Sequence, residues 1–185
     1  MNSNKVIAEY SVIKTKRLVL KPFCEKYLTQ EYVNWLNDLE VVRYSEQRHH
    51  KHTIESCRRY IKSFEGSPNY IWVILAVSDN LGHIGNINAY VDEKNRIADV
   101  GILIGKKEVW NRGYGSEAWS GVCNYLLNIL KLRKVTGGAI STNKVMLRLM
   151  QKAGMVKDGR RTRHYLWEGN EVDIIHMAIF REKKK

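Results

Sequence analysis

The feature that most constrains the fold is a strand that runs into a glycine-containing turn and then into an amphipathic helix. The strand is predicted over Arg96 to Ile104, and the turn is Trp110-Asn111-Arg112-Gly113-Tyr114-Gly115. The helix is predicted from Ser116 to Leu130, because apolar side chains recur on one face of it. Glycine lets a backbone approach a ligand closely, and the first N–H groups of a helix lack intrahelical partners. This segment therefore predicts an anion cradle at the start of the helix.

Two other phosphate-binding motifs are excluded at this turn. The dinucleotide pattern G-x-G-x-x-G lacks its third glycine, because Ala118 stands there, and no G-K-[ST] completes a P-loop. Arg112 adds a permanent cation beside the turn, which favours an anionic ligand. A glycine turn that opens a helix and binds nothing is the alternative that spacing alone leaves open.

The other expected elements mix hairpins with strand–helix–strand units. Lys16 to Pro22 alternates like a half-buried strand, and the apolar run Tyr70 to Val77 indicates a buried central strand. The order of all the expected strands and helices along the chain predicts a mixed α+β fold and not a doubly wound sheet. The remaining predictions are helices at Thr29 to Leu39, Thr53 (as N-cap) to Phe64 and Asn143 to Ala153, and strands at His83 to Val91, Lys134 to Ile140, Arg161 to Trp167 and Asp173 to Phe180.

Composition is that of an ordinary globular chain. Hydrophobic residues make up 44% of the 185 and charged residues 27%, without a linker or repeat, so we expect one domain over 1–185. Residues 1–14 are expected to be an N-terminal extension and 181–185 a flexible basic tail. No stretch approaches the ~20 apolar residues that span a bilayer, and no secretory signal is visible, so we expect no membrane partner.

The cysteines indicate the compartment. Cys24, Cys57 and Cys123 are odd in number and far apart, which suits a reducing compartment and predicts a cytoplasmic protein. Cys123 falls on the apolar face of a predicted helix, where a core thiol is expected.

The formal net charge of +12 fits a polyanionic ligand, and nucleic acid is one such ligand. A nucleic-acid-binding domain would need a basic stripe on one face. The charges here are scattered over loops and the tail 181–185. We therefore expect no nucleic-acid partner and keep that class as an alternative.

Three motifs carry a family resemblance. Thr15 to Leu20 is similar to T-x-R-L-x-L, Trp35-Leu36-Asn37-Asp38 is similar to a first-helix signature, and Trp110 to Ala118 is similar to W-G-K-G-Y-[AG]-T-E-A. With Asn143 and Gly154-Met155 further on, the chain resembles the GNAT superfamily of N-acetyltransferases. Its closest resemblance is to the branch of the ribosomal-protein N-terminal acetyltransferases, over about Thr15 to Phe180.

The resemblance implies a central, largely antiparallel, splayed sheet flanked by helices, and acetyl-CoA as the acyl donor without a metal. The strand segment Gly101, Ile102, Leu103 and Ile104 would hydrogen-bond the pantetheine arm as an added strand does. Asn143 would lie beside the pantetheine or the thioester. Backbone N–H groups of the turn would bind the pyrophosphate, namely those of Asn111, Arg112, Gly113, Tyr114, Gly115 and Ser116.

The sequence departs from the family pattern at three positions. Trp110 stands where the superfamily commonly has Gln or Arg, and the ribosomal-protein branch also has tryptophan there. Met150 stands where other GNAT branches have a tyrosine that protonates the leaving thiolate. Met146 stands where the Rim-like branch often has serine. No general acid can therefore be named.

Acid–base chemistry has two candidates, because an attacking amine must lose a proton. Asp99 matches a position where related enzymes often carry Glu, and it is the first candidate for base or amine anchor; an ion pair with a basic neighbour is its alternative. Glu46, in the loop between the first two helices, is the second. In the same loop, Arg48 and His52 are expected to contact an anionic acceptor such as the phosphates of a nucleotide sugar. The run His49 to His52 lacks an i, i+4 helical pair and an acidic ligand, so we expect no metal site.

These features predict an N-acetyltransferase in which a primary amine attacks acetyl-CoA directly in a ternary complex. The acceptor is a small amine, an amino sugar on a nucleotide carrier, or a protein N-terminus. A CoA-binding regulatory module without catalysis stays open because the general acid is missing. Assembly as a homodimer also stays open.

Overall fold

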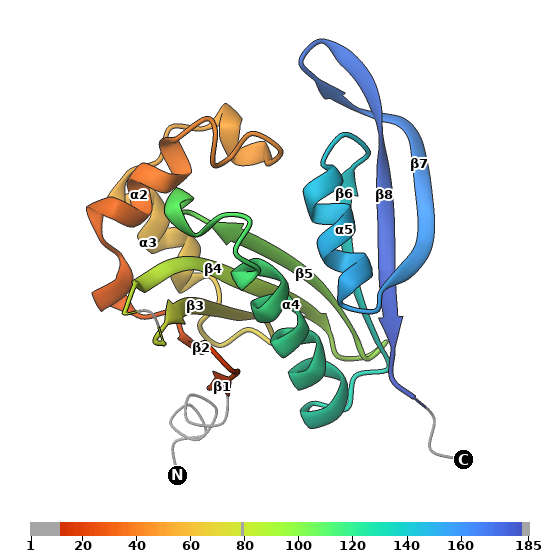
Figure 1. Ribbon diagram of the computed structural model, residues 1–185, viewed down its shortest axis with the longest axis horizontal. Coiled ribbons are helices and arrows are strands. Elements are labelled where there is room, and N and C mark those ends of the chain that lie inside the picture. The colour runs from red at the N-terminus through yellow and green to blue at the C-terminus, as the bar shows by residue number, and fades with distance from the viewer. Residues whose placement is uncertain (1–11, 79, 183–185) are drawn as a thin grey trace.

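The computed structural model describes residues 12–78 and 80–182. These residues form an eight-stranded sheet in the order β1-β2-β3-β4-β5-β6-β8-β7, flanked by helices on both faces (Figure 1). Of the neighbouring strand pairs, β5–β6 is parallel and the others are antiparallel. This confirms the predicted mixed α+β fold with a largely antiparallel sheet. The predictions for the two chain ends fall largely outside the described residues.

The strands and helices have the following bounds. The strands are β1 (Ile13–Lys14), β2 (Leu18–Pro22), β3 (Tyr70–Ala76), β4 (Gly82–Asp92), β5 (Ile97–Ile104), β6 (Lys134–Ile140), β7 (Val156–Trp167) and β8 (Asn170–Phe180). The α-helices are α2 (Gln30–Asn37), α3 (Ile54–Lys62), α4 (Tyr114–Asn124) and α5 (Lys144–Lys152). Short 3-10 turns lie at Glu25–Tyr27, Glu46–His49 and Lys107–Val109. No helix among the described residues is long and apolar enough to cross a bilayer.

Two elements differ most from the expected ranges. The helix predicted over Ser116 to Leu130 is α-helical only to Asn124 and continues as a wider π-helical turn, Tyr125–Ile129. In this wider turn three consecutive residues, 125–127, are buried in the core. Strand β7 begins at Val156, five residues before the predicted strand, and two bulges let it follow β8 without regular alternation.

The central strand β3 is buried on both faces, as its apolar run predicts. Trp72 and Ile74 pack with α4 and the π-helical turn in one core, while Ile71 and Val73 pack with α2 and α3 in a second core. Cys123 of α4 lies in the first core, where burial raises the pKa of its thiol to about 12. The prediction of a core thiol is confirmed.

The second core contains a histidine enclosed by aromatic rings. The His83 ring lies 5.0 Å from that of Trp35 and 5.6 Å from that of Tyr27, measured between centroids, and it also contacts Phe23 and Tyr32. Nε2 lies 3.0 Å from the Gly85 carbonyl oxygen. Burial lowers the pKa of His83 to about 4, although the Gly85 carbonyl opposes the shift. The folded protein therefore holds this imidazole neutral.

This depressed pKa predicts acid destabilisation. An unfolded histidine titrates near 6.5, so between pH 6.5 and about 4 the unfolded chain binds more protons at this site than the folded one. The contribution of His83 to the free energy of unfolding is fully present above pH 6.5. It is lost as the pH falls to 4, and the loss is on the order of 3 kcal/mol. Urea unfolding at pH 7, 5.5 and 4.5 should show His83→Gln with a shallower pH slope than the wild type. Parallel slopes for the two proteins would contradict the assignment.

Candidate active site

The site begins where the sheet splays. Strands β5 and β6 pair only between residues 97–99 and 134–136, and they diverge beyond (Figure 1). In the ladder with β4, the Gly105 N–H donates to the Ile84 carbonyl over 3.0 Å. Because donors alternate along an antiparallel strand, Ile102, which lies beyond the last pair with β6, directs its backbone groups away from β4 and into the gap. The gap thus has an inner edge able to bond an extended ligand.

Helix α4 begins with an open set of backbone donors. Its N-cap is Gly113, with φ +83° and no side-chain cap, and Asn111 also has a positive φ of 61°. The Glu117 N–H donates to the Gly113 carbonyl, so the intrahelical bonds start only at that residue. The N–H groups of the preceding turn and the helix dipole are both suited to an anion.

A groove of about 520 Å³ connects the start of α4 with the gap. Among the residues predicted to bind the cofactor, eight line it: Ile102, Ile104, Asn111, Gly113, Tyr114, Gly115, Ser116 and Asn143. Ten residues that the sequence did not assign to the cofactor line the groove as well. They are Glu40, Val41 and Tyr44 from the loop after α2, Val109 before the turn, Trp110 at its start, and Val145, Met146, Arg148, Leu149 and Lys152 on α5.

Three residues of the predicted cofactor set do not line this groove. Strand alternation places Gly101 and Leu103 on the opposite face of the sheet from Ile102, and Leu103 packs against the α2–α3 core. Arg112 lies over the Tyr114 ring at 5.4 Å, and its carbonyl accepts a 3.0 Å hydrogen bond from Arg17. The groove is therefore lined by alternate residues of β5 and not by the whole segment.

The positions associated with a general acid are apolar here. Met150 is fully buried, and its sulfur lies near Gly137 in the first core. Met146 lines the groove. Asn143 uses its side-chain oxygen to cap α5, accepting from the Met146 N–H at 3.1 Å. The two tyrosines of the groove are Tyr44, in the loop after α2, and Tyr114, in the turn.

Glu117 fastens the turn to the start of the sheet. Its carboxylate accepts hydrogen bonds from the Thr15 hydroxyl at 2.6 Å, the Arg17 N–H at 2.7 Å and the Arg17 guanidinium at 2.7 Å. Burial alone would raise the pKa of Glu117, but these hydrogen bonds outweigh it and leave the pKa lowered. Two of the motifs identified in the sequence, about 100 residues apart, thus form one hydrogen-bonded unit.

We expect Glu117→Gln to destabilise the fold, because the amide cannot satisfy three donors as a carboxylate does. The loss should be about 1–3 kcal/mol in urea unfolding at pH 7. Because the folded-state pKa is depressed, the difference from the wild type should shrink as pH falls through that pKa. Glu108→Gln, at an exposed carboxylate just before the turn, is the control and should change the stability by no more than roughly 0.5 kcal/mol, as surface substitutions usually do. Equal losses in both variants would contradict the proposed anchor.

The motif Trp35-Leu36-Asn37-Asp38 also has a structural explanation. Trp35 packs on Gly105, where a Cβ atom would overlap the indole ring. The Asn37 amide holds the following loop by accepting from the His52 N–H at 2.8 Å and donating to its carbonyl at 2.9 Å. Asp38 pairs with Lys107 at 2.7 Å. The motif therefore attaches the loop after α2 to the strand that lines the groove.

Asp99 lies at the last paired position before the splay, on the opposite face of the sheet from Ile102. Its carboxylate is exposed and accepts a 2.6 Å hydrogen bond from the Thr136 hydroxyl of β6. Register places Tyr90 beside it on β4, and the Tyr90 hydroxyl lies 3.2 Å from that of Tyr60. Asp99 has no ion pair within the described residues. The alternative of an ion pair with a basic neighbour therefore does not describe this structure.

A group of contacts that we call the clasp joins the loop after α2 to the tip of the β7–β8 hairpin. The Tyr44 and Trp167 rings stack at 5.5 Å, and Arg43 pairs with Glu168 at 3.3 Å. Arg48 donates to the Tyr165 hydroxyl at 3.0 Å. In Figure 1 the two segments approach one another above the open end of the splay. The clasp residues are Arg43, Tyr44, Glu46 and Arg48 on the loop and Tyr165, Trp167 and Glu168 on the hairpin.

The clasp engages two residues predicted to serve catalysis or substrate binding. Glu46 accepts from the Tyr165 hydroxyl and pairs with Arg48 at 3.0 Å. The Arg48 side chain is 15% exposed and also donates to the Ser45 and Leu166 carbonyls. Burial and the bond to Glu46 raise the pKa of Tyr165, although Arg48 opposes the shift. The charges of Glu46 and Arg48 thus face each other within the clasp.

His52 lies at the end of the same loop, where its backbone bonds Asn37. Its Nε2 is buried and lacks a hydrogen-bond partner among the described residues. Across the residues that the structure describes, no group of three or more His, Cys, Asp or Glu is arranged to hold a metal.

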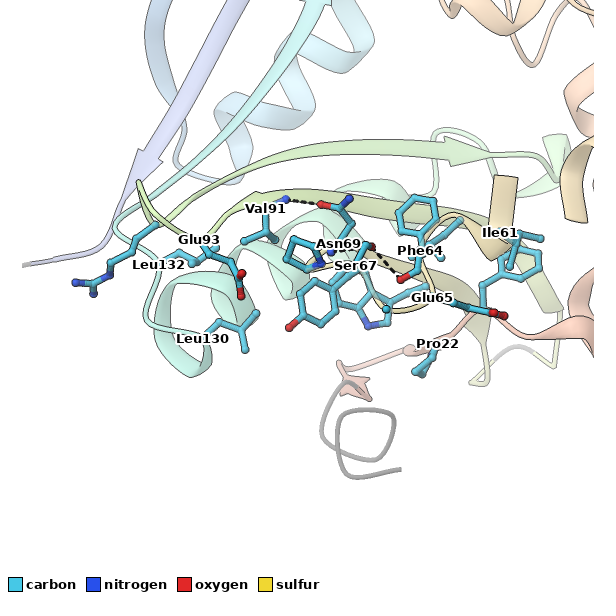
Figure 2. A pocket seen from close by; sticks show the side chains of 17 residues that line it. Pro22, Ile61, Phe64, Glu65, Ser67, Asn69, Val91, Glu93, Leu130 and Leu132 are labelled. Carbon is cyan, nitrogen blue, oxygen red and sulfur yellow. Dashed lines mark hydrogen bonds between the residues drawn. The ribbon is translucent and has the colours of Figure 1, made fainter. Parts of the chain in front are cut away.

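A second hollow lies at another end of the sheet (Figure 2). It measures about 790 Å³ and is lined mainly by the α3–β3 loop and the first residues of β3. Figure 2 shows Asn69 bonded to the Val91 N–H and Ser67 bonded to the Phe64 carbonyl, so part of the polar lining is engaged internally. Although this hollow is larger, it contains neither a helix start nor any of the predicted site residues. The groove beside α4 is the better candidate site.

Comparisons with known proteins agree with this geometry. The family described as "Acetyltransferase (GNAT) domain" matches residues 17–156. No curated protein sequence matches the chain significantly. Solved structures share the fold at low identity. A GNAT-family acetyltransferase from Bacillus anthracis superposes with a TM-score of 0.78 at 22% identity, covering 93% of this chain and 99% of that one.

Two further neighbours have named acceptors. Spermidine N-acetyltransferase from Vibrio cholerae, solved with CoA and spermine, has a TM-score of 0.78 at 17% identity, with 90% and 97% of the two chains covered. Ribosomal-protein-S5-alanine acetyltransferase from Vibrio fischeri has a TM-score of 0.79 at 14% identity, with 94% and 98% covered. These likenesses establish the fold, and they do not single out the ribosomal-protein branch. Because the family match spans most of the chain, the protein belongs to the GNAT family of acetyltransferases.

Proposed function

We propose that the protein transfers the acetyl group of acetyl-CoA to a primary amine by direct attack in a ternary complex. The observation that carries the proposal is the groove, which runs from the uncapped start of α4 into the gap between β5 and β6. It offers donors for a pyrophosphate at one end and a strand edge for an extended arm at the other. Asp99 is the last residue of β5 that pairs with β6, so it lies where the gap begins, on the opposite face of the sheet from Ile102.

The protein's contribution to donor binding is mainly backbone. N–H groups of Asn111 and of Gly113 to Ser116 would hold the pyrophosphate, whereas the Arg112 N–H donates to the Val109 carbonyl at 3.3 Å. The free edge groups of Ile102 would pair with the amides of the pantetheine arm. The Ile102 N–H on the same edge would stabilise negative charge on the thioester oxygen as the amine attacks. Acetyl-CoA supplies the activated acyl group.

The reaction forms a C–N bond and breaks a C–S bond. The amine nitrogen attacks the thioester carbon, the amine loses a proton, and the CoA thiolate gains one on leaving. Asp99 is the proposed acceptor of the amine proton or the anchor of its ammonium form, and Thr136 orients the carboxylate through the 2.6 Å hydrogen bond. Tyr44 is the phenol of the loop that lines the groove, but we assign no residue as general acid.

The clasp favours a small acceptor. Because it spans the open end of the splay, a folded protein surface could enter the gap from that end only if the stacked Tyr44 and Trp167 rings separated. Arg48 is bonded within the clasp, so the support that it gave to an anionic acceptor is weakened. The neighbours by fold act on spermidine or on a ribosomal protein, so both classes of amine belong in the test. Three free cysteines support the reducing, cytoplasmic compartment that we propose for the reaction.

An acceptor panel tests the proposal. Release of free CoA from acetyl-CoA would be followed with polyamines, amino sugars, nucleotide-linked amino sugars, and peptides with free N-termini. We expect turnover with one class of small amine and little with the peptides. Thermal unfolding with acetyl-CoA alone should show a concentration-dependent rise in Tm. A rise in Tm without turnover on any acceptor would favour a non-catalytic CoA-binding module, and no rise at millimolar acetyl-CoA would overturn the proposal.

A further inference from the structure

The outer wall of the groove carries a row of cations on α5. Lys144, Arg148 and Lys152 recur every four residues on this nine-residue helix, which contains no acidic residue. Residues with this spacing lie one above the other on a helix. Arg148 and Lys152 line the groove, whereas Lys144 does not. All three are exposed, and none forms an ion pair within the described part of the chain.

The row lies close to the proposed pyrophosphate site. Leu149, which stands between the two groove-lining cations, approaches the start of α4 so closely that a Cβ on Gly115 would be 3.2 Å from its Cδ1 atom. Arg148 precedes Leu149 by one residue, and Lys152 follows it by three. The two cations are therefore within one helical turn of the point where α5 meets the cradle.

The chemistry of the donor places a second phosphate in this neighbourhood. In CoA the ribose that is joined to the pyrophosphate through its 5′ oxygen carries a phosphomonoester on its 3′ oxygen. Such a monoester bears a charge of about −1.5 to −2 at pH 7 and has several acceptor oxygens. A guanidinium can bind it through two parallel hydrogen bonds, and an ammonium adds a point charge.

We propose that Arg148 and Lys152 bind the ribose 3′-phosphate, so that the enzyme distinguishes CoA esters from their 3′-dephospho forms. This inference rests on the proposed function, because it assigns a subsite within the same groove. The alternative is a solvated helix face, in which the three cations are equivalent and none senses the ligand. The position of Lys144 outside the groove makes these two cases distinguishable.

Calorimetric titration with CoA and with 3′-dephospho-CoA tests the subsite. For the wild type we expect CoA to bind about 10- to 100-fold more tightly, the range of charge-assisted hydrogen bonds. Arg148→Gln combined with Lys152→Gln should bring that ratio close to one by weakening CoA while leaving dephospho-CoA within about twofold. Lys144→Gln, the matched control on the same helix, should keep the wild-type ratio.

The outcomes separate the subsite from the proposed function. Equal binding of both ligands by the wild type would overturn the subsite and leave the proposed function intact. A double variant that weakened both ligands alike would also overturn it, because the effect would then not depend on the 3′-phosphate. Binding of neither ligand by the wild type would reject the proposed function itself. If Lys144→Gln also lost the preference for CoA over 3′-dephospho-CoA, the preference would come from the combined charge of the helix and not from a specific site. That result would overturn the subsite.

Discussion

Gly113→Glu should abolish the rise in Tm caused by acetyl-CoA. Gly113 has φ +83° and caps α4, so a glutamate there places a carboxylate where the pyrophosphate is proposed to bind. Like charges brought together in this way cost several kcal/mol, so we expect at least about a 100-fold loss of affinity. At an acetyl-CoA concentration about 100 times the wild-type Kd, binding should raise the free energy of unfolding of the wild type by about 2.7 kcal/mol. The same concentration should leave that of the variant nearly unchanged. Differential scanning fluorimetry across an acetyl-CoA series measures both.

The matched control is Gly82→Glu. Gly82 also has a positive φ, +67°, is exposed, and has open space where a Cβ would be added. It therefore suffers a similar backbone strain and the same change of charge, but it lies outside the groove. Both variants should lose roughly 1–2 kcal/mol without ligand, and only the Gly82 variant should respond to acetyl-CoA. A normal response of Gly113→Glu would remove the start of α4 from the donor site.

Asp99→Asn should lower kcat/KM by about 100- to 10,000-fold, the range for loss of a positioned acid–base group. The amide keeps the size of the carboxylate and can still bond Thr136, but it cannot take a proton or hold an ammonium group. Affinity for acetyl-CoA should stay within about twofold, because Asp99 lies on the other face of the sheet from the groove. Steady-state kinetics with the best amine of the panel, together with acetyl-CoA titration, separates the two effects.

A second carboxylate controls for a general loss of charge. Asp92, in the β4–β5 turn, is exposed and bonded to Asn95, and Asp92→Asn should leave kcat/KM unchanged. Asp99→Glu should recover part of the activity, because it restores the proton acceptor at a shifted position. If Asp99→Asn turned over amines at the wild-type rate, the base would have to lie elsewhere on the acceptor side.

The parts of the site that sequence predicts are those formed by contiguous residues. The turn Trp110 to Gly115 follows from glycine chemistry and from the strand and helix on either side of it, and all of its residues except Arg112 line the groove. Thr53 was expected as an N-cap, and it forms a capping box with Ser56. Strand alternation places Gly101 and Leu103 on the other face of the sheet from the groove. The sequence does not show this by itself, because it does not tell which face of β5 lines the groove.

Contacts between distant segments could not be predicted in the same way. The sequence places Tyr165 and Trp167 only in a terminal strand, and it predicts Arg48 as a loop residue that contacts an anionic acceptor. Their roles depend on the meeting of two segments that are 117 residues apart at Arg48 and Tyr165. The row on α5 was missed for a related reason, because its cations acquire meaning only when Leu149 is seen to approach Gly115.

The clasp also makes one entrance of the gap depend on contacts between segments that are far apart in the chain. Arg43 and Glu168 are separated by 125 residues. The entropy lost when a loop closes grows with the length of that loop, so these surface contacts can form only after the sheet has already brought the two segments together. Removal of the β7–β8 hairpin would leave the loop after α2 without its partners Tyr165, Trp167 and Glu168, and the open end of the splay would then be unbridged.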